Sequence, residues 1–531
     1  MTTAPAANAD RVPQHQHLPP PPRFNLTAYC LAPAPIRAAA ATGLVVVHDA
    51  HAPIEDAERW SFGDLDRAVR RVGAGLLAAG LLPGDRLLLR MGNTSDAALL
   101  FFGAIAVGAV AVPTSAMLTA DEVAFVAADA EPALVAAVAE LRHTVPAGLP
   151  TIGPDEVTRW VAGESGEALT YADTAADDPA FLVYTSGTTG EPKGVLHAHR
   201  SAWGRRPMYA GWLGIGPGDV LLHAGAFNWT YTLGVGLTDP WASGATSVIY
   251  NGPRDPAVWG RLIAMTGATL FAAVPGVYRQ LLASHGVEGT DLTSLRHGLT
   301  AGEALTPGLH AAWVSATGKP LYEALGMSEI STYISSGPQV PTRPGSPGKP
   351  QRGRRIGILP LVPGPDLDAE VEPGQTGLLA VHRSDPGLML GYWRRPDEDA
   401  KAFRGSWFVG GDLAHVDPDG YVIHHGRADD VMNAQGYRVS PQEVEKVLAG
   451  APGVADVGVT EVAVRPGVGI ITAFVVPAAG ERPDPAQIIA YAGDHLAAYK
   501  LPKEVRWVAT LPRTANGKVL RRHLADCPPL P

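Results

Sequence analysis

Residues 181–200 read FLVYTSGTTGEPKGVLHAHR, and this stretch decides the fold. Its first four residues, Phe181 to Tyr184, are apolar and predict a short buried strand. The strand runs into a loop of small hydroxyl residues and glycines, namely Thr185, Ser186, Gly187, Thr188, Thr189 and Gly190. Glycine lets backbone N–H groups turn toward an anion where a Cβ would clash, and Lys193 adds a mobile positive charge. The stretch therefore predicts a loop that binds the phosphates of a nucleotide.

The order of residues in this loop differs from that of a Walker A loop, in which serine or threonine and a helix directly follow the lysine. Here Gly194 follows Lys193, and Pro192 precedes it. A loop of serine, threonine and glycine is by itself usually a surface turn. The interpretation therefore depends on partner motifs elsewhere in the chain.

The composition is that of a globular protein with several domains. The chain has 531 residues, of which 46% are hydrophobic and 18% charged, and its net charge is −10. Because no basic block is present, nucleic acid is not an expected partner. The two cysteines, Cys30 and Cys527, lack metal-binding spacing and fit a reduced, cytoplasmic setting. The longest apolar run, residues 97–113, is shorter than the roughly 20 residues of a membrane span, so no span is expected.

Strand-like runs alternate with amphipathic segments through much of the chain. Residues 61–80 show helical spacing, with Ser61 or Asp64 as the N-cap and Gly80 as the stop, and residues 95–109 predict another helix. The runs that predict strands are 133–138, 181–184, 220–223, 246–250 and 270–274. This alternation predicts an α/β fold in which helices cover parallel sheets.

The pattern changes near Gly345, after which short strands and Gly/Pro/Asp turns predict a smaller β-rich section. Further on, helices at 441–448 and 485–498 and strands at 454–459 and 470–476 predict a compact α+β module. We therefore expect three parts: a disordered Pro/Ala-rich tail over 1–22, a large domain over 23–427 and a small, mobile C-terminal domain over 428–531.

Four further motifs occur in order: LYEALGMSE at 321–329, WFVGGDLA at 407–414, HHGRADDVMNAQGYRVSPQEVE at 424–445 and LPRTANGKVLRR at 511–522. With these motifs and residues 181–200, the chain resembles the adenylate-forming superfamily of acyl- and aryl-CoA ligases, carrier-protein adenylation domains and luciferases. The resemblance covers nearly the whole chain beyond the first 25 residues. Within this superfamily, the chain resembles the benzoate-CoA ligases and medium-chain acyl-CoA synthetases.

The resemblance implies a role for each motif at the nucleotide. The expected catalytic residues are Ser328, which would touch the α-phosphate, Glu329, which would hold Mg²⁺, and Lys518, which would touch the carboxylate and the α-phosphate. Asp412 would accept the ribose hydroxyls. The other residues expected at the nucleotide are Thr185 to Gly190, Lys193, Gly302, Glu303, Glu323, Ala324, Leu325 and Arg427. Leu325 stands where an aromatic residue often stacks on adenine, and Gly410 stands where threonine is commoner.

The same resemblance implies moving parts. Asp429 would be the hinge, and the residues facing CoA would be Gly436, Tyr437 and Arg438. Lys518 is also an expected target of a lysine acetyltransferase and deacetylase, because neutralising it would remove the needed charge. His424, His425 and Asp429 spell the HHxxxD pattern of acyltransferase condensation sites, which we interpret as a coincidence of the overlapping motif.

The stretches that line the acid pocket in relatives contain aromatic residues beside small ones. The candidates are His223, Phe227, Trp229, Tyr231, Pro275, Gly276 and Ala301. This mixture favours a flat or apolar acid over acetate. Each aromatic residue alone is equally explained by core packing, and His223 alone by a buried histidine whose hydrogen bonds are satisfied.

The expected function is that of an ATP-dependent acid-CoA ligase. It would adenylate a benzoate-like or medium-chain acid, release pyrophosphate and pass the acyl group to CoA, using ATP, Mg²⁺ and CoA. A homodimer is a further expectation. Two alternatives remain open: a stand-alone enzyme that loads an acyl-carrier protein, and a non-catalytic nucleotide-binding scaffold. The first is less favoured because no carrier domain is apparent, and the second because Glu329, Asp412 and Lys518 are present.

Overall fold

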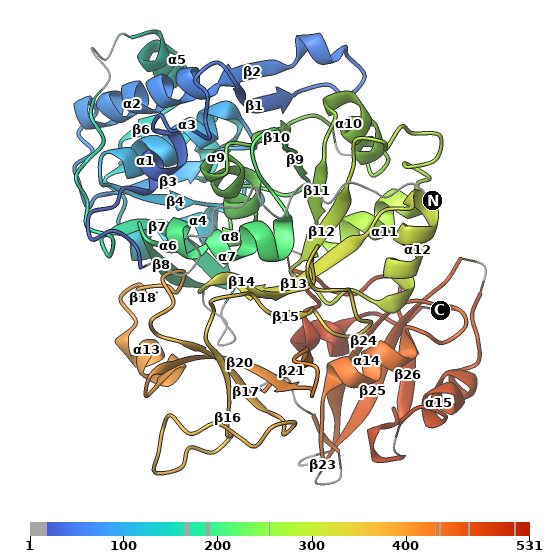
Figure 1. Cartoon of the computed structure of the whole chain (residues 1–531). Coiled ribbons are helices and arrows are strands. Elements are labelled where there is room, and N and C mark those ends of the chain that lie inside the picture. Colours follow the sequence, from blue (N-terminus) through green and yellow to red (C-terminus); the bar gives the residue numbers. More distant parts are fainter. Residues whose placement is uncertain are drawn as a thin grey trace.

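The framework of the protein is a pair of large sheets, of nine and seven strands. The computed structural model describes residues 19–163, 169–186, 192–253, 255–428, 430, 432–434, 437–465, 468–479, 481–496, 498–514 and 517–530. The two large sheets and their helices fill the upper part of Figure 1, and a β-rich section and the C-terminal part lie below them. The predicted α/β architecture, with its smaller C-terminal domain, is confirmed.

The nine-stranded sheet has the order β15-β14-β13-β12-β11-β9-β10-β1-β2. Neighbouring strands from β13 to β1 are parallel, whereas β2, β14 and β15 pair antiparallel at the edges. The strands are β1 (Thr42–Val47), β2 (Glu58–Ser61), β9 (Val220–His223), β10 (Thr246–Tyr250), β11 (Leu270–Ala273), β12 (His297–Ala301), β13 (Leu321–Met327), β14 (Ser331–Ser335) and β15 (Lys349–Pro350). Because parallel strands end at one edge, β9, β11, β12 and β13 bring the residues that follow them together.

The seven-stranded sheet has the order β18-β8-β7-β4-β3-β5-β6. The strands β3 (Arg86–Arg90), β4 (Val110–Pro113), β5 (Leu134–Ala137), β6 (Thr151–Ile152) and β7 (Pro179–Ser186) are parallel, as predicted. β8 (Pro192–Ala198) and β18 (Gly391–Tyr392) pair antiparallel. The expected phosphate loop therefore joins the two strands of a hairpin, β7 and β8, next to the distant segment β18.

Helices cover both sheets (Figure 1). α2 (Phe62–Ala78) begins after Ser61, whose hydroxyl accepts a hydrogen bond from the Asp64 amide, so Ser61 is the N-cap. α3 (Ser95–Ala106) is almost entirely buried in the core between the sheets. The other helices before residue 403 are α1 (Leu26–Leu31), α4 (Ala120–Ala130), α5 (Pro154–Ala162), α6 (Ser201–Gly204), α7 (Arg206–Met208), α8 (Thr230–Leu233), α9 (Asp239–Ala242), α10 (Val258–Thr266), α11 (Pro275–Ala283), α12 (Pro307–Thr317) and α13 (Pro396–Ala402). Among the described helices, none combines the length and the apolar character that crossing a bilayer requires.

The β-rich section is an antiparallel sheet with the order β16-β17-β20-β19, and β21 pairs with β20. Its strands are β16 (Ile356–Leu359), β17 (Gly377–His382), β19 (Phe403–Arg404), β20 (Trp407–Val416) and β21 (Val422–Arg427). β21 ends at Arg427, which is where the sequence predicts the large domain to end.

The C-terminal part has its own apolar core, which includes Val444, Val459 and Ile471. Its elements are the hairpin of β22 (Met432–Ala434) and β23 (Tyr437–Val439), the helices α14 (Pro441–Leu448) and α15 (Pro485–Gly493), and the three-stranded sheet of β24 (Val454–Arg465), β25 (Val468–Pro477) and β26 (Glu504–Trp507). A separate core is what allows such a part to move as a unit.

Candidate active site

Tyr392 in β18 joins two residues that the sequence predicts around the phosphates. Its hydroxyl donates a hydrogen bond to Glu329 Oε1 over 2.7 Å. The Lys193 ammonium lies 5.7 Å from the centre of the Tyr392 ring and is ion-paired with Glu398. Lys193 and Glu329, which come from different sheets, therefore meet at one tyrosine that the sequence analysis did not single out.

The start of the expected phosphate loop is held in a hairpin. Thr185 lies opposite Lys193 in the β7–β8 register. The Tyr184 hydroxyl donates to Asp129 Oδ2 over 2.6 Å and anchors the end of β7. Ser186 is the last residue of β7, and residues 187–190 lie outside the described part of the chain. The phosphate contacts of this loop stay a prediction.

Ser328 and Glu329 follow β13 in a turn that His197 holds. His197 Nε2 donates to the Ser328 carbonyl over 2.8 Å, and the imidazole stacks on Phe181. Burial lowers the pKa of His197 to about 3, so the ring is neutral at physiological pH. A neutral histidine thus ties β8 to the motif that carries the expected catalytic pair.

Asp412 in β20 is a nearly buried carboxylate with a histidine partner. Its Oδ1 accepts a hydrogen bond from His424 Nε2 over 3.1 Å. Burial favours the neutral acid, but the hydrogen bond and charge of His424, together with nearby cations, outweigh burial and lower the pKa of Asp412. The charges of Arg427 and Lys518 act in the same direction. Asp412 is therefore an ionised acceptor, and His424, which the sequence analysis treated as part of a coincidental pattern, supports it.

The motifs approach one another through two tyrosines, the buried Tyr333 and the half-buried Tyr392. Burial raises the pKa of Tyr333, and the carboxylates of Asp412 and Glu329 both add to this rise, so Tyr333 lies near both. Burial and Glu329 likewise raise the pKa of Tyr392, which the Arg427 charge opposes. Arg427 itself donates to the Gly410 carbonyl over 2.9 Å. Lys193 and Glu329 therefore both lie at Tyr392, and the charges of Asp412 and Arg427 act on this same pair of tyrosines.

Packing explains the glycine at position 410, where the resemblance described above implies that threonine is commoner. A β-carbon at position 410 would lie 2.6 Å from Met327 Cε. Met327 thus occupies the space that a side chain at position 410 would need.

The turn that carries Lys518 lies against the large domain. The turn closes through hydrogen bonds from Thr514 N to the Lys518 carbonyl, at 2.8 Å, and from Lys518 N to Thr514 Oγ1, at 3.1 Å. A β-carbon at Gly517 would lie 2.7 Å from Glu303 Oε1, so glycine permits this close approach. The charge of Lys518 also helps to lower the pKa of Asp412. The Lys518 turn therefore lies near residues that the sequence predicts at the nucleotide.

Glu303 forms ion pairs with two arginines. Arg513 Nη1 lies 3.1 Å from its Oε1, and Arg279 Nη2 lies 3.4 Å from its Oε2. Burial raises the pKa of Glu303 against the effect of both arginines. Arg513 also pairs with Asp456 at 2.6 Å within the C-terminal part. The carboxylate that was expected at the nucleotide thus docks the C-terminal part, a role that the sequence analysis missed although Arg513 lies inside the quoted motif.

Glu323, Ala324 and Leu325 lie in β13, with their side chains turned inward. The Glu323 carboxylate is 7% exposed and accepts a hydrogen bond from the Leu305 amide over 2.9 Å. Burial raises its pKa to about 7. Ala324 is buried in the core between the large sheets, and Leu325 packs against the β-rich section. A nucleotide contact by these residues stays a prediction.

Several residues expected in the acid pocket form an aromatic row. Trp229 and Tyr231 meet edge to face with ring centres 5.3 Å apart, and Tyr231 and His223 likewise at 4.8 Å. A β-carbon at Gly302 would lie 3.2 Å from Trp229 Cη2, so the row reaches the residue next to Glu303. The other candidates lie on the same strand ends: Phe227 is half-buried after β9, Pro275 and Gly276 open α11, and Ala301 ends β12.

The expected hinge and CoA-facing residues remain predictions. Asp429 and Gly436 lie outside the described residues. Tyr437 and Arg438 belong to β23, opposite β22. This hairpin directly follows the end of the β-rich section, which is a suitable place for a hinge.

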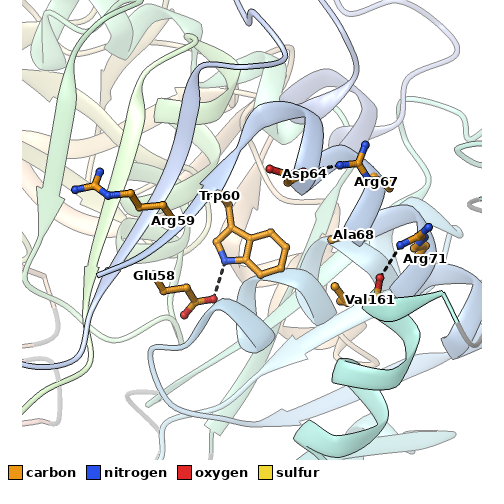
Figure 2. A pocket seen from close by; sticks show the side chains of 8 residues that line it. All are labelled: Glu58, Arg59, Trp60, Asp64, Arg67, Ala68, Arg71 and Val161. Carbon is orange, nitrogen blue, oxygen red and sulfur yellow. Dashed lines mark hydrogen bonds and ion pairs between the residues drawn. The ribbon is translucent and has the colours of Figure 1, made fainter. Parts of the chain in front are cut away.

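A pocket of about 280 Å³ lies elsewhere, between β2, α2 and the end of α5 (Figure 2). The polar groups that line it bond to one another: the Trp60 indole donates to Glu58 over 2.6 Å, and Arg71 donates to the Val161 carbonyl over 2.7 Å. These elements lie at the far end of the molecule from β20, β21 and α14 (Figure 1). The pocket is therefore separate from the site described above.

The site suits a magnesium ion that arrives with its nucleotide. Among the described residues, no three His, Cys, Asp or Glu side chains are grouped as a protein-made metal cage would need. Glu329 supplies a carboxylate beside Lys193 and Tyr392. Mg²⁺ is typically held by one or two carboxylates together with substrate phosphates, so the residues present fit it.

The two-sheet fold with its small C-terminal part, and the motif residues Lys193 and Glu329 that lie at Tyr392, point to the class of adenylate-forming enzymes. A family model described as AMP-binding enzyme matches residues 39–393, and one described as AMP-binding enzyme C-terminal domain matches residues 443–518. The chain belongs to the AMP-binding enzyme family, and it is an AMP-forming acid–CoA ligase, as the motifs predict.

The chain is similar to CoA ligases along almost its whole length. It is 33% identical over 494 residues to the 3-hydroxybenzoate--CoA ligase of Aromatoleum sp. (strain CIB), which covers 90% of this chain and 93% of that protein. ATP-bound MatB from Rhodopseudomonas palustris has a TM-score of 0.85 at 28% identity, covering 94% of this chain and 98% of that one. The anthranilate CoA ligase AuaEII in complex with anthranoyl-AMP has a TM-score of 0.84 at 27% identity, covering 95% and 97%.

Proposed function

We propose that the protein joins an aromatic, benzoate-type carboxylic acid to CoA in two steps at this site. The observation that carries the proposal is the row of Trp229, Tyr231 and His223, which begins beside Gly302 and the turn that holds Lys518. A flat ring fits between aromatic edges and small residues, whereas acetate would leave that surface uncovered. Similar proteins named for 3-hydroxybenzoate and anthranilate support an aromatic acid.

In the first step, a carboxylate oxygen of the acid attacks the α-phosphorus of ATP, and pyrophosphate leaves. No side chain has to act as a base, because the carboxylate is already ionised. Lys193 and the loop after Thr185 would bind the phosphates, Asp412 the ribose, and Lys518 the α-phosphate and the incoming carboxylate. Each well-placed donor of this kind is typically worth about 2.7–4 kcal/mol.

Mg²⁺ on Glu329 would neutralise phosphate charge in this step. The hydrogen bond from Tyr392 to Glu329 orients the carboxylate, and the ion pair with Glu398 holds Lys193 nearby.

In the second step, the CoA sulfur attacks the acyl carbon, the thiol proton is lost to solvent, and AMP leaves. In this proposal the C-terminal part turns about Asp429, takes Lys518 out of the site and brings Gly436, Tyr437 and Arg438 to CoA. Such gating by domain rotation is common in enzymes that perform two reactions in one site. The homodimer, the cytoplasmic setting and the acetylation of Lys518 stay predictions.

A substrate panel tests the proposal. Pyrophosphate release is measured with benzoate, hydroxybenzoates, octanoate and acetate, and thioester formation with CoA or with a phosphopantetheinylated carrier protein. We expect the highest kcat/KM for an aromatic acid and transfer to CoA. A higher kcat/KM for octanoate or acetate than for every aromatic acid would refute the aromatic assignment, and transfer to the carrier protein alone would refute CoA as acceptor.

A further inference from the structure

His223 is a buried histidine at the end of a strand of the nine-stranded sheet. It ends β9, lies opposite Ala272 of β11 and is only 4% exposed. Neither Nδ1 nor Nε2 has a hydrogen-bond partner among the described residues. A buried polar group without a partner destabilises the folded protein. A polar group of a bound ligand could form the missing hydrogen bond to His223 and remove this destabilisation.

The protonation state of His223 limits which chemical group of a ligand could bond to its ring nitrogens. Burial lowers its pKa to about 3, so the imidazole is neutral at physiological pH, with one donor and one acceptor nitrogen. Burial is the sole cause of this shift, and no charged group of the described chain contributes to it. A second carboxylate on the acid would find no opposite charge here, whereas a hydroxyl can either donate to or accept from the ring.

The position of His223 limits where on the bound acid such a hydroxyl would lie. Its ring packs edge to face on Tyr231, and a β-carbon at Gly225 would lie 2.8 Å from its Cε1. Tyr231 in turn meets Trp229, which reaches Gly302 at the end of the pocket that faces the Lys518 turn. An acid whose carboxylate lies at Gly302 would therefore extend its ring along Trp229 and Tyr231, with its far side toward His223.

We propose that His223 selects an aromatic acid that bears a hydroxyl group at ring position 3 or 4, by hydrogen-bonding that hydroxyl at the floor of the acid pocket. This assignment rests on the proposed function, since it names the substrate within the aromatic acids. His223 is then a residue that determines specificity, with no part in the transfer of AMP. A site built to bond a substrate hydroxyl discriminates strongly against the analogue that lacks it, because its own polar group is then left unpaired.

The test compares kcat/KM for benzoate and for 2-, 3- and 4-hydroxybenzoate by pyrophosphate release. We expect the wild type to prefer the 3- or the 4-hydroxy acid to benzoate by roughly tenfold or more. The His223→Phe variant keeps a flat ring but no polar atom, and should lose this preference. The His223→Gln variant keeps a donor and an acceptor and should retain part of the preference. The exposed His143, replaced by Phe, is the matched control and should leave all rates unchanged.

The outcomes separate this inference from the proposed function. If no aromatic acid is activated but octanoate or acetate is, the proposed function itself is wrong. If benzoate is activated as well as or better than the 3- and 4-hydroxy acids, or if His223→Phe retains the wild-type ratio, only the role of His223 is refuted. Should His223→Phe fail to fold, the wild-type ratio and that of His223→Gln decide: a wild type without the preference, or a preference that His223→Gln leaves unchanged, overturns the inference.

Discussion

Arg513 Nη1 lies 3.1 Å from Glu303 Oε1 and thereby pairs the turn before Lys518 with the end of a strand in the nine-stranded sheet. The same arginine bonds to the Gly517 carbonyl over 2.6 Å, so the contact to Glu303 and the shape of the Lys518 turn depend on one side chain. Arg279 pairs with the other oxygen of Glu303. The pair of Arg513 and Glu303 holds the Lys518 turn against the large domain, and this pair would have to break in the rotation of the C-terminal part that we propose.

Replacing Glu303 by Gln should therefore slow the first half-reaction more than the second. The variant keeps the size of the side chain but removes the charge that holds Arg513, and we expect ATP–pyrophosphate exchange to fall about tenfold, which corresponds to roughly 1.4 kcal/mol. Thioester formation from supplied acyl-adenylate should change little. Glu481→Gln, at an exposed carboxylate of the C-terminal part, is the control. An equal loss in both half-reactions would contradict the docking role.

Replacing Lys518 by Ala should abolish adenylation and largely spare CoA transfer. The lysine charge acts at Asp412 in this structure and is expected at the α-phosphate, where one donor is worth about 2.7–4 kcal/mol or a hundredfold and more in rate. The exposed Lys503 of the C-terminal part, replaced by Ala, is the matched control. The two half-reactions are followed separately, by pyrophosphate exchange and by thioester formation from acyl-adenylate. Equal loss of both would refute the assigned role.

The sequence predicts the fold well where a local pattern decides the structure. The strands β9 and β10 and the helix α14 have the predicted bounds, because each is a short apolar or amphipathic run between clear breaks. The hairpin of β7 and β8 was not specified, since an apolar strand gives no sign of whether its neighbour runs parallel or antiparallel. Of the residues that the motifs predict at the nucleotide, Lys193 and Glu329 both lie at Tyr392, while their contacts to a nucleotide stay a prediction.

The parts of the site that escaped prediction are contacts between distant segments. Tyr392 lies far along the chain from both Lys193 and Glu329, and nothing in its own surroundings marks it as their neighbour. The docking of Arg513 on Glu303 depends on where a whole C-terminal part lies. His424 could have been noticed, because its strand pairs antiparallel with the Asp412 strand and places His424 opposite Ala414, two residues from Asp412.

Replacing His424 by Phe should weaken ATP binding, and more so at low pH. His424 donates to Asp412 and helps to lower its pKa, so without it the carboxylate is protonated at a higher pH than in the wild type. A protonated Asp412 is a poorer acceptor for the ribose hydroxyls that it is expected to bind. We expect KM for ATP to rise several-fold at pH 7.5, and the ratio of variant to wild type to increase toward pH 5.5, while KM for the acid changes little. A ratio that stays the same across this range would show that His424 acts on packing alone.

Replacing Glu323 by Gln should change how stability depends on pH. The pKa of Glu323 is raised from about 4.5 to about 7 by burial, so the folded protein favours its neutral form. The favourable contribution is complete below pH 4.5 and is lost as the pH rises to 7, which amounts to about 3 kcal/mol at most. Gln is neutral at every pH, and its amide oxygen can still accept the hydrogen bond from Leu305. The variant should therefore gain stability relative to the wild type between pH 5 and pH 8, seen as a rise in the difference between their Tm values. Glu372→Gln, at an exposed position, should show no such rise. If the Tm of Glu323→Gln differs from that of the wild type by the same amount at pH 5 and at pH 8, Glu323 is already ionised in the folded protein at pH 5.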